Sequence, residues 1–148
     1  GVVPIFLMAV VILNSYFYSP AIVHGPSMEP TFYEGNVVII RLEQDPYQTN
    51  EVVIYDRGDA LLIKRIVAVA GDTLVVDETG VTINGALMDY EGNEWQYHNY
   101  NGVIPDNMYF LVGDNDAYSN DSRYFGLVSE DDLLGEVVFT FNNGRDDG

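Results

Sequence analysis

The sequence predicts a mainly β fold, because strand patterns repeat along most of the chain and long helix patterns do not. From residue 37 onward, short runs rich in Val, Ile, Tyr and Phe alternate with Gly, Asn and Asp turns. No long amphipathic helix pattern follows residue 20, and 47% apolar residues in a chain of 148 suffice for the core of one domain. The expected strands are Val37–Arg41, Glu51–Tyr55, Ala60–Ala70, Thr73–Asp77, Met108–Val112 and Glu136–Phe141, with a long loop or hairpin excursion over residues 89–106.

Charge and cysteine content exclude several function classes. The 23 acidic residues outnumber the 6 Lys and Arg residues, which gives a formal net charge of −17. Phosphates repel such a surface, so we expect no nucleic-acid partner and no adhesion to anionic lipid through a basic patch. The absence of cysteine from the sequence removes disulfides, thiolate catalysis and Cys-based zinc sites.

The N-terminal segment carries no charge before Glu29. Residues 2–13 are apolar except for Pro4, and an aromatic cluster follows at Tyr16–Tyr18. The apolar run is shorter than the roughly 20 residues that span a bilayer. It is either the second half of a membrane helix, with its aromatic end at the interface, or a buried strand or helix of the core. In so acidic a chain the missing charge favours the former, so we predict a truncated membrane anchor over residues 1–19 and one domain over residues 20–148.

Lys64 is the one lysine of the chain and lies in the most apolar expected strand, Ala60–Ala70. Alternate strand residues face opposite sides, so Lys64 and Arg65 point to different faces, and both faces are apolar. Burial of an ammonium group favours the neutral amine and lowers its pKa, and a neutral amine is a general base near pH 7. The alternative is a lysine that reaches the end of the strand or pairs with a carboxylate.

Ser27 lies in a short loop that two prolines and a glycine stiffen, Gly25-Pro26-Ser27-Met28-Glu29-Pro30. A nucleophile needs a fixed approach, and exposed N–H groups of a rigid backbone can stabilise an oxyanion. The alternative is a serine that caps a short turn. His24 is too near in sequence to serve as a base for Ser27, and His98 has no evident orienting partner. The base that we expect is therefore Lys64, in a Ser–Lys dyad.

An acidic, serine-rich turn at residues 113–126 is the third unusual stretch. Its spacing is close to that of a calcium loop, but aromatic and serine residues occupy positions that need a ligand or a glycine. We therefore expect no metal ion there. Ser119 or Ser122 of this turn can hydrogen-bond an amine such as that of Lys64.

These three stretches together resemble the bacterial type I signal peptidases (leader peptidases, peptidase family S26). These are membrane-bound Ser–Lys proteases that remove signal peptides from exported proteins. The family motif S-M-x-P-T matches Ser27–Thr31, K-R-[IV] with a following G-D matches Lys64–Asp72, and G-D-N-x-x-x-S-x-D-S-R-x-x-G matches Gly113–Gly126. Order and spacing agree over roughly residues 20–140. The resemblance implies a signal-peptidase/LexA-like β fold for the catalytic domain, with an N-terminal transmembrane helix.

The resemblance also implies a role for each motif residue. Ser27 is the implied nucleophile, Lys64 the general base, and Ser119 the serine that orients the lysine amine. The oxyanion hole is implied at the Ser27 backbone N–H. Some members have a second donor, a serine, where this chain has Gly25, so a backbone group or water must substitute.

Two further sets of residues follow from the resemblance. A structural ion-pair cluster beside the site is implied for Arg65, Asp121 and Arg123. Small apolar S1 and S3 pockets, which fit the Ala-x-Ala before the cleavage site, are implied for Val23, Met28, Phe32, Leu62 and Ile63. The chain departs from the family at Asp116, where arginine is frequent, which removes a cation near the site.

The implied partners are preprotein signal peptides and, through the N-terminal segment, the lipid bilayer. The implied location is the bacterial cell membrane with the catalytic domain on the extracytoplasmic side, and no cofactor or metal is expected. Two alternatives differ in class. A self-cleaving LexA-like repressor shares the β fold but lacks support in this acidic chain without a DNA-binding domain. A surface-anchored acidic β module that binds a protein partner would leave Ser27 and Lys64 merely structural.

Overall fold

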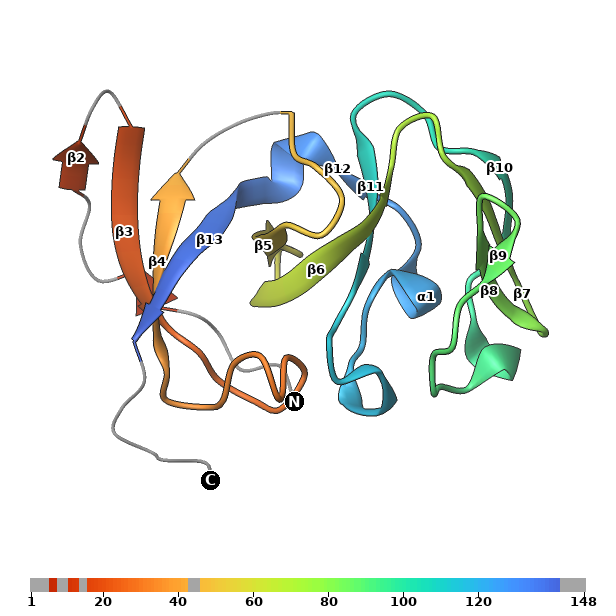
Figure 1. Ribbon diagram of the computed structural model, residues 1–148, viewed down its shortest axis with the longest axis horizontal. Helices are drawn as coiled ribbons and strands as arrows, with labels where there is room; N and C mark the ends of the chain where they lie inside the picture. Colours follow the sequence, from red (N-terminus) through yellow and green to blue (C-terminus); the bar gives the residue numbers. More distant parts are fainter. Residues whose placement is uncertain (1–5, 8–10, 14–15, 43–45, 142–148) are drawn as a thin grey trace.

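Two antiparallel sheets of unequal size make up the described part of the chain (Figure 1). The computed structural model describes residues 6–7, 11–13, 16–42 and 46–141. The described strands of the large sheet follow the order β1-β3-β4-β13-β5-β6-β11-β12, and β2 also pairs with β3. Their bounds are β1 (Phe6–Leu7), β2 (Val11–Leu13), β3 (Tyr16–Ile22), β4 (Val37–Leu42), β5 (Val52–Asp56), β6 (Leu61–Val69), β11 (Met108–Val112), β12 (Val128–Ser129) and β13 (Leu133–Phe141).

The small sheet follows the order β10-β7-β8-β9 and lies at the opposite end of the molecule from β3 and β4 (Figure 1). Its strands are β7 (Thr73–Asp77), β8 (Gly80–Ile83), β9 (Ala86–Leu87) and β10 (Tyr100–Val103). The helices of the described residues are all short: the 3₁₀ turns η1 (Glu94–Gln96), η2 (Asp116–Tyr118) and η3 (Glu130–Asp132), and α1 (Ser122–Phe125).

The mainly β prediction is confirmed, and the expected strands agree closely with the observed ones. Strands β7 and β11 have the predicted bounds, β4 differs from them by one residue at one end, and β5 and β6 differ by one residue at each end. Strand β13 is longer and begins at Leu133. The excursion over residues 89–106 contains η1 and β10, and the sequence pattern missed β8, β9 and β10. These strands are short and partly exposed, so their hydrophobic pattern is weak.

The N-terminal segment differs from the predicted helix wherever it is described. Residues 6–7, 11–13 and 16–22 form strands, and β3 pairs with β4 from Phe17–Leu42 to Ile22–Val37. Ser19 of β3 is fully buried. The rest of the predicted anchor, residues 1–5, 8–10 and 14–15, lies outside the described residues. No helix in the described ranges has the length and apolar character needed to cross a bilayer.

Three clusters of buried side chains form the core. The first lies under β3, β4 and β5 and includes Val23, Met28 and Phe32 from the loop after β3. The second joins the small sheet to β6 and β11, with Leu74, Val76 and Phe110 among its members. The third packs side chains of β5, β6, β11 and β13. Because β6 contributes to all three clusters, its residues lie where the parts of the molecule meet.

Candidate active site

The loop that carries Ser27 connects β3 and β4 and is held from both sides. Its apolar side chains Met28 and Phe32 are 1% and 6% exposed and belong to the first core cluster. Asn115 holds the other side: its backbone N–H donates to the Ser27 carbonyl at 2.8 Å and its side-chain amide to the Pro26 carbonyl at 2.9 Å. Gly25 has φ +81°, a conformation that favours glycine, and no atom lies within 4 Å of the position that a Cβ would take. The hydroxyl is therefore presented by a backbone with little freedom.

Lys64 is buried in the middle of β6, with its side chain 3% exposed. Its amine donates a 3.0 Å hydrogen bond to the Ser119 hydroxyl, which in turn donates to Asp121 Oδ2 at 2.7 Å. Burial lowers the pKa of Lys64 to about 8; Asp121 opposes this shift, and the positive charges of Arg123 and Arg57 add to it. A substantial fraction of Lys64 is thus neutral near pH 8 and able to accept a proton.

Gly113 brings the serine loop and the lysine together. A Cβ at this position would overlap the Ser119 side chain and lie 2.7 Å from the Ser27 carbonyl oxygen. The Ser27 backbone and the Ser119 side chain therefore both lie against a residue that has room for no side chain. Since Ser119 holds the Lys64 amine, the turn at residues 113–119 places all three predicted residues in one region.

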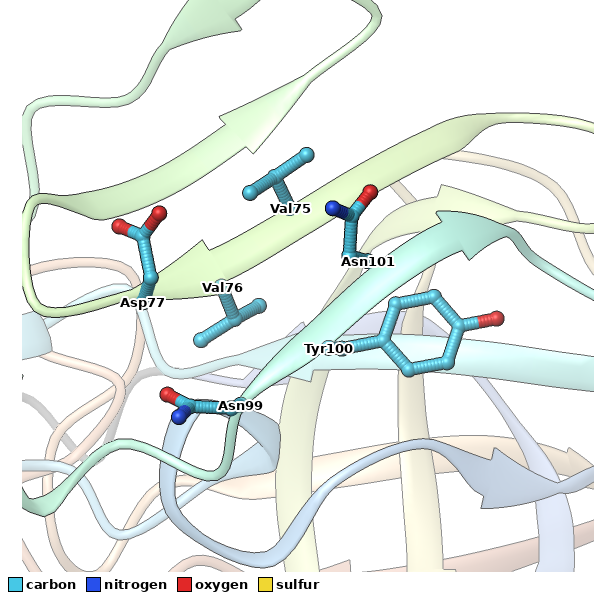
Figure 2. A pocket seen from close by; sticks show the side chains of 6 residues that line it. All are labelled: Val75, Val76, Asp77, Asn99, Tyr100 and Asn101. Carbon is cyan, nitrogen blue, oxygen red and sulfur yellow. The ribbon is translucent and has the colours of Figure 1, made fainter.

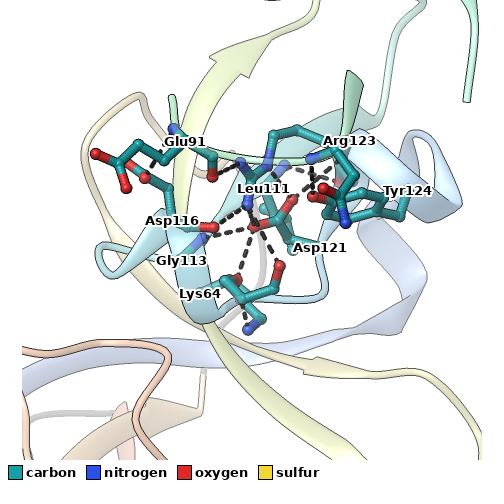
Figure 3. A network of polar contacts seen from close by, with 11 residues as sticks. Lys64, Glu91, Leu111, Gly113, Asp116, Asp121, Arg123 and Tyr124 are labelled. Carbon is teal, nitrogen blue, oxygen red and sulfur yellow. Dashed lines mark hydrogen bonds and ion pairs between the residues drawn. The ribbon is translucent and has the colours of Figure 1, made fainter. Parts of the chain in front are cut away.

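Asp121 and Arg123 form the expected ion pair, with both side chains fully buried. Arg123 donates to both carboxylate oxygens, at 2.8 and 2.9 Å, and Asp121 Oδ2 also accepts from the Gly113 N–H at 3.1 Å (Figure 3). Arg123 therefore fixes the carboxylate of Asp121, to which the Ser119 hydroxyl donates.

A family profile described as signal peptidase, peptidase S26, matches residues 2–142. The chain belongs to this family. Membership makes it a serine-type peptidase, a hydrolase of the class that removes signal peptides.

Curated relatives agree with the membership of this S26 chain. "Signal peptidase IB" of Staphylococcus aureus (strain COL) is 29% identical over 88% of this chain and 81% of that protein. "Signal peptidase I V" of Bacillus subtilis (strain 168) is 29% identical over 93% of this chain and 92% of that protein. A crystal structure of a signal peptidase I from Enterococcus faecalis V583 aligns over 65% of this chain and 100% of that chain, with 22% identity and a TM-score of 0.48.

One member of the expected ion-pair cluster of this S26 chain lies elsewhere. Arg65 pairs with Asp114 and not with Asp121, through two hydrogen bonds of 2.7 Å. Successive residues of β6 face opposite sides of the sheet, so Arg65 and Lys64 lie on different faces. Arg65 reaches Asp114 because Val112, at the end of β11, pairs with it in the sheet. The prediction that the Asp121–Arg123 pair extends to Arg65 was wrong.

The Ser27 hydroxyl makes no hydrogen bond with the Lys64 amine within the described ranges, where Lys64 donates to Ser119 instead. Hydrogen bonds between a nucleophile and its base are often long without substrate and tighten when it binds. The described contacts therefore locate the two groups in one region without a direct hydrogen bond between them.

The residues predicted to bind substrate lie largely in the core beneath the serine loop. Val23, Met28, Phe32 and Ile63 are buried to 6% exposure or less in one cluster, and Leu62 is half-buried. A pocket of about 270 Å³ lies elsewhere, on the small sheet, where none of the predicted residues lines it (Figure 2). Its lining residues are Val75, Val76, Asp77, Asn99, Tyr100 and Asn101.

Sequence reasoning missed two groups of residues around the site. Asp114, which holds Arg65 and accepts from Thr31, ties β6 to the serine loop. Asp114 and Thr31 both belong to the motifs named above, so membership of a motif could have marked them as residues of the site. Three tyrosines around Arg123 form the second group. Tyr90 and Tyr97 lie in the polar, aromatic excursion, whose composition was the available hint, and Tyr124 lies in α1, within the motif Gly113–Gly126.

No group of three or more His, Asp or Glu residues with metal-binding geometry is found among the residues that the structure describes.

Proposed function

We propose that this chain removes signal peptides from exported preproteins by cutting after Ala-x-Ala, with Ser27 as nucleophile and Lys64 as general base. One observation carries the assignment. The chain's single lysine is buried, its pKa is lowered to about 8, and its amine is held by Ser119 beside the loop of Ser27. A buried lysine is costly to keep, and such costs concentrate at functional sites.

The proposed chemistry needs one proton acceptor and proceeds in two halves. In acylation, Lys64 Nζ takes the hydroxyl proton while Ser27 Oγ bonds to the scissile carbonyl carbon, and the carbonyl becomes an oxyanion. Collapse of this intermediate breaks the C–N bond, and the Lys64 ammonium gives its proton to the leaving amine. Neutral Lys64 then deprotonates water, which attacks the carbonyl carbon of the acyl-enzyme. The C–O bond to Ser27 breaks, the Lys64 ammonium returns its proton to Ser27 Oγ, and the signal peptide leaves with its new carboxylate.

The oxyanion is proposed to bind the Ser27 backbone N–H. Gly25 supplies no side-chain donor, so a second donor must come from backbone or water. The stretch before the cleavage site is proposed to add as a strand beside the site. Its small side chains would contact Val23, Met28, Phe32, Leu62 and Ile63. Because four of these side chains are already packed in the core, only a small P1 or P3 residue would fit beside them.

Cleavage of a signal-peptide-derived peptide in detergent tests the assignment. Wild type should cut after Ala-x-Ala, and Ser27→Ala and Lys64→Ala should each lower kcat/KM by at least about 10⁴-fold. Ser129→Ala, which removes a hydroxyl at the N-cap of η3, should keep wild-type activity. A serine-directed acylating agent should label wild type and neither dyad variant. Full activity of folded Lys64→Ala contradicts the mechanism, and a folded wild type that is neither active nor labelled favours a binding module.

We also propose that the domain acts on the extracytoplasmic face of the bacterial membrane, which it contacts through exposed aromatic side chains of β13. Support comes from β13, where Phe139 and Phe141 are 56% and 50% exposed and their rings meet in a T-shaped arrangement with centroids 4.9 Å apart. Phe141 pairs with Val37, the first residue of β4, so these rings lie at the sheet end where the serine loop rejoins the sheet. Exposed aromatic side chains at that position suit the headgroup region of a bilayer.

Sedimentation with phosphatidylcholine vesicles tests the membrane proposal. A Phe139→Ser/Phe141→Ser double variant should bind the vesicles at least about tenfold more weakly than wild type. Trp95→Ser, which removes a 76% exposed aromatic ring from η1 on the small-sheet side, is the matched control and should bind like wild type. Equal binding by all three proteins would show that the aromatic side chains of β13 do not contact the membrane.

A further inference from the structure

The segment Tyr90–Asn93 follows β9 and lies against the turn that carries Ser119 (Figure 3). The Glu91 N–H donates to Asp116 Oδ1 at 3.0 Å, and the Glu91 carbonyl accepts from Arg123 Nη1 at 3.1 Å. Asn93 N–H donates to the Tyr124 hydroxyl at 3.0 Å. Three backbone groups, two of Glu91 and one of Asn93, are thus tied to side chains of the turn at residues 113–119 and of α1.

Arg123 is the centre of these contacts. Its side chain is fully buried, and beyond Asp121 and Glu91 it donates to the carbonyls of Asp116 and Ser119, at 2.7 and 3.3 Å. The rings of Tyr90, Tyr97 and Tyr124 surround the guanidinium, with centroids 5.5, 5.9 and 5.3 Å from its central carbon. Such cation–π contacts strengthen when the cation is removed from water.

Gly92 makes this enclosure possible. A Cβ at this position would lie 2.7 Å from the hydroxyls of Tyr97 and Tyr124 and 2.9 Å from Arg123 Nη1. Two of these groups are held in place, since Arg123 is buried with each of its three guanidinium nitrogens hydrogen-bonded and the Tyr124 hydroxyl accepts from Asn93. Even one methyl group at residue 92 must therefore move the guanidinium, its tyrosines or the segment itself.

A short chain of polar contacts leads from Arg123 to the proposed base. Arg123 Nη2 and the Ser119 hydroxyl both donate to the same oxygen, Asp121 Oδ2, at 2.9 and 2.7 Å. Ser119 is also the acceptor of the Lys64 amine. A displacement of the guanidinium therefore changes the position or the charge balance of the carboxylate that holds the lysine's partner.

We propose that the Tyr90–Asn93 segment is a positioning element for the base: by clamping Arg123, it determines where Asp121 and Ser119 hold the Lys64 amine. This inference rests on the proposed Ser–Lys mechanism. It gives the small-sheet excursion a part in the reaction that does not require its side chains to touch substrate. Asp116, where the family often has arginine, contributes by holding Glu91.

The chain's single lysine allows a direct test. Protein labelled with ¹³C at lysine gives one lysine side-chain resonance, so its NMR titration reports the pKa of Lys64 without any assay of activity. The charge of Arg123 lowers this pKa and that of Asp121 raises it. Loosening the guanidinium should therefore raise the pKa. We expect Gly92→Ala to raise it by about half a unit or more.

The acidic limb, which is the fall of kcat/KM at low pH, is measured with a signal-peptide-derived peptide. Its midpoint should shift to higher pH as the Lys64 pKa rises. Asp116→Ala should act in the same direction, and Asp116→Asn, which keeps an oxygen acceptor for Glu91, should return towards wild type. Gly102→Ala is the matched control in β10, where the nearest atoms lie 3.9 Å from the new Cβ, and it should match wild type.

Two outcomes overturn the inference, and they differ. If Gly92→Ala and Asp116→Ala lower the melting temperature but leave the Lys64 pKa and the acidic limb unchanged, the segment has a structural role only. If the Lys64 pKa rises while the activity profile stays in place, Lys64 is not the base, and the proposed mechanism fails with the inference. Should Gly92→Ala not fold, the Asp116→Ala and Asp116→Asn pair decides by the same readouts.

Discussion

Arg65 donates two hydrogen bonds of 2.7 Å to the carboxylate of Asp114 and so joins β6 to the turn that follows β11. The same carboxylate accepts from Thr31 of the serine loop, and the Asp114 N–H lies 3.4 Å from the Met28 sulfur. One residue therefore connects the strand of the proposed base to the loop of the proposed nucleophile.

Asp114→Asn should destabilise the protein, because an amide cannot replace both charged hydrogen bonds with Arg65. The expected loss is about 1–3 kcal/mol at pH 7, measured by urea unfolding. Burial opposes the shift, but hydrogen bonds from Arg65 and Thr31 lower the pKa of Asp114 below 3.8. Its stabilisation is thus present above pH 3.8 and lost as the pH falls through the lowered pKa. Asp59→Asn, at the exposed Arg57 pair, should change stability little; an equal loss there would refute a special role for Asp114.

Activity should depend on pH through Lys64. In the proposed mechanism the neutral amine is the active form, and burial lowers the pKa of Lys64 from 10.5 to about 8. Below this value, kcat/KM should fall about tenfold per pH unit, and it should level off above it. Hydrolysis of a signal-peptide-derived peptide from pH 5 to pH 10 measures the profile. A flat profile down to pH 5 is incompatible with a lysine base.

Lys64→Met should abolish activity and yet stabilise the fold near neutral pH. Unfolded Lys64 keeps its proton up to 10.5, whereas the folded amine loses it near 8, so the buried charge weakens the native state below pH 8. Removing the charge should stabilise by up to about 3 kcal/mol at pH 7, less about 1 kcal/mol for the lost Ser119 hydrogen bond. The gain should shrink as the pH rises from 8 to 10.5. Urea unfolding at pH 7 and pH 10 measures it, and a gain that does not depend on pH would contradict a lowered pKa.

Ser119→Ala and Ser122→Ala should separate orientation of the base from packing of the turn. Both hydroxyls are buried, but Ser119 accepts from Lys64 whereas Ser122 accepts from the Leu111 N–H at 2.9 Å. Ser119→Ala should lower kcat about 10²-fold and should also cost about 1–3 kcal/mol of stability, because it leaves the buried Lys64 amine without its acceptor. Ser122→Ala should cost about 1–3 kcal/mol of stability and keep kcat, because it leaves a buried N–H unpaired. Equal kcat in the two variants would show that Ser119 does not orient the amine.

The sequence predicted structure well where a feature depends on a single strand and its flanking turns. Alternating apolar runs located β4, β5, β6, β7 and β11 almost to the residue, since a strand's bounds follow its own pattern and turns. The same logic placed Lys64 in an apolar strand, and the burial that lowers its pKa follows from that position. Motif spacing named Ser27 and Ser119, and the hydrogen bond from Lys64 to Ser119 was among the expected contacts.

Contacts between distant segments were decided by the tertiary structure alone. The partner of Arg65 depends on the end of β11 lying beside β6, and nothing within Lys64–Asp72 encodes that neighbour. For the same reason a segment that reads as a polar loop became the clamp around Arg123, and an apolar N-terminus formed β3 against β4. The sequence by itself determined which residues favour strands, turns and burial, because those preferences act over a few neighbouring positions. Only the folded chain decided which charges meet, because Coulomb and hydrogen-bond energies depend on distances that long-range packing sets.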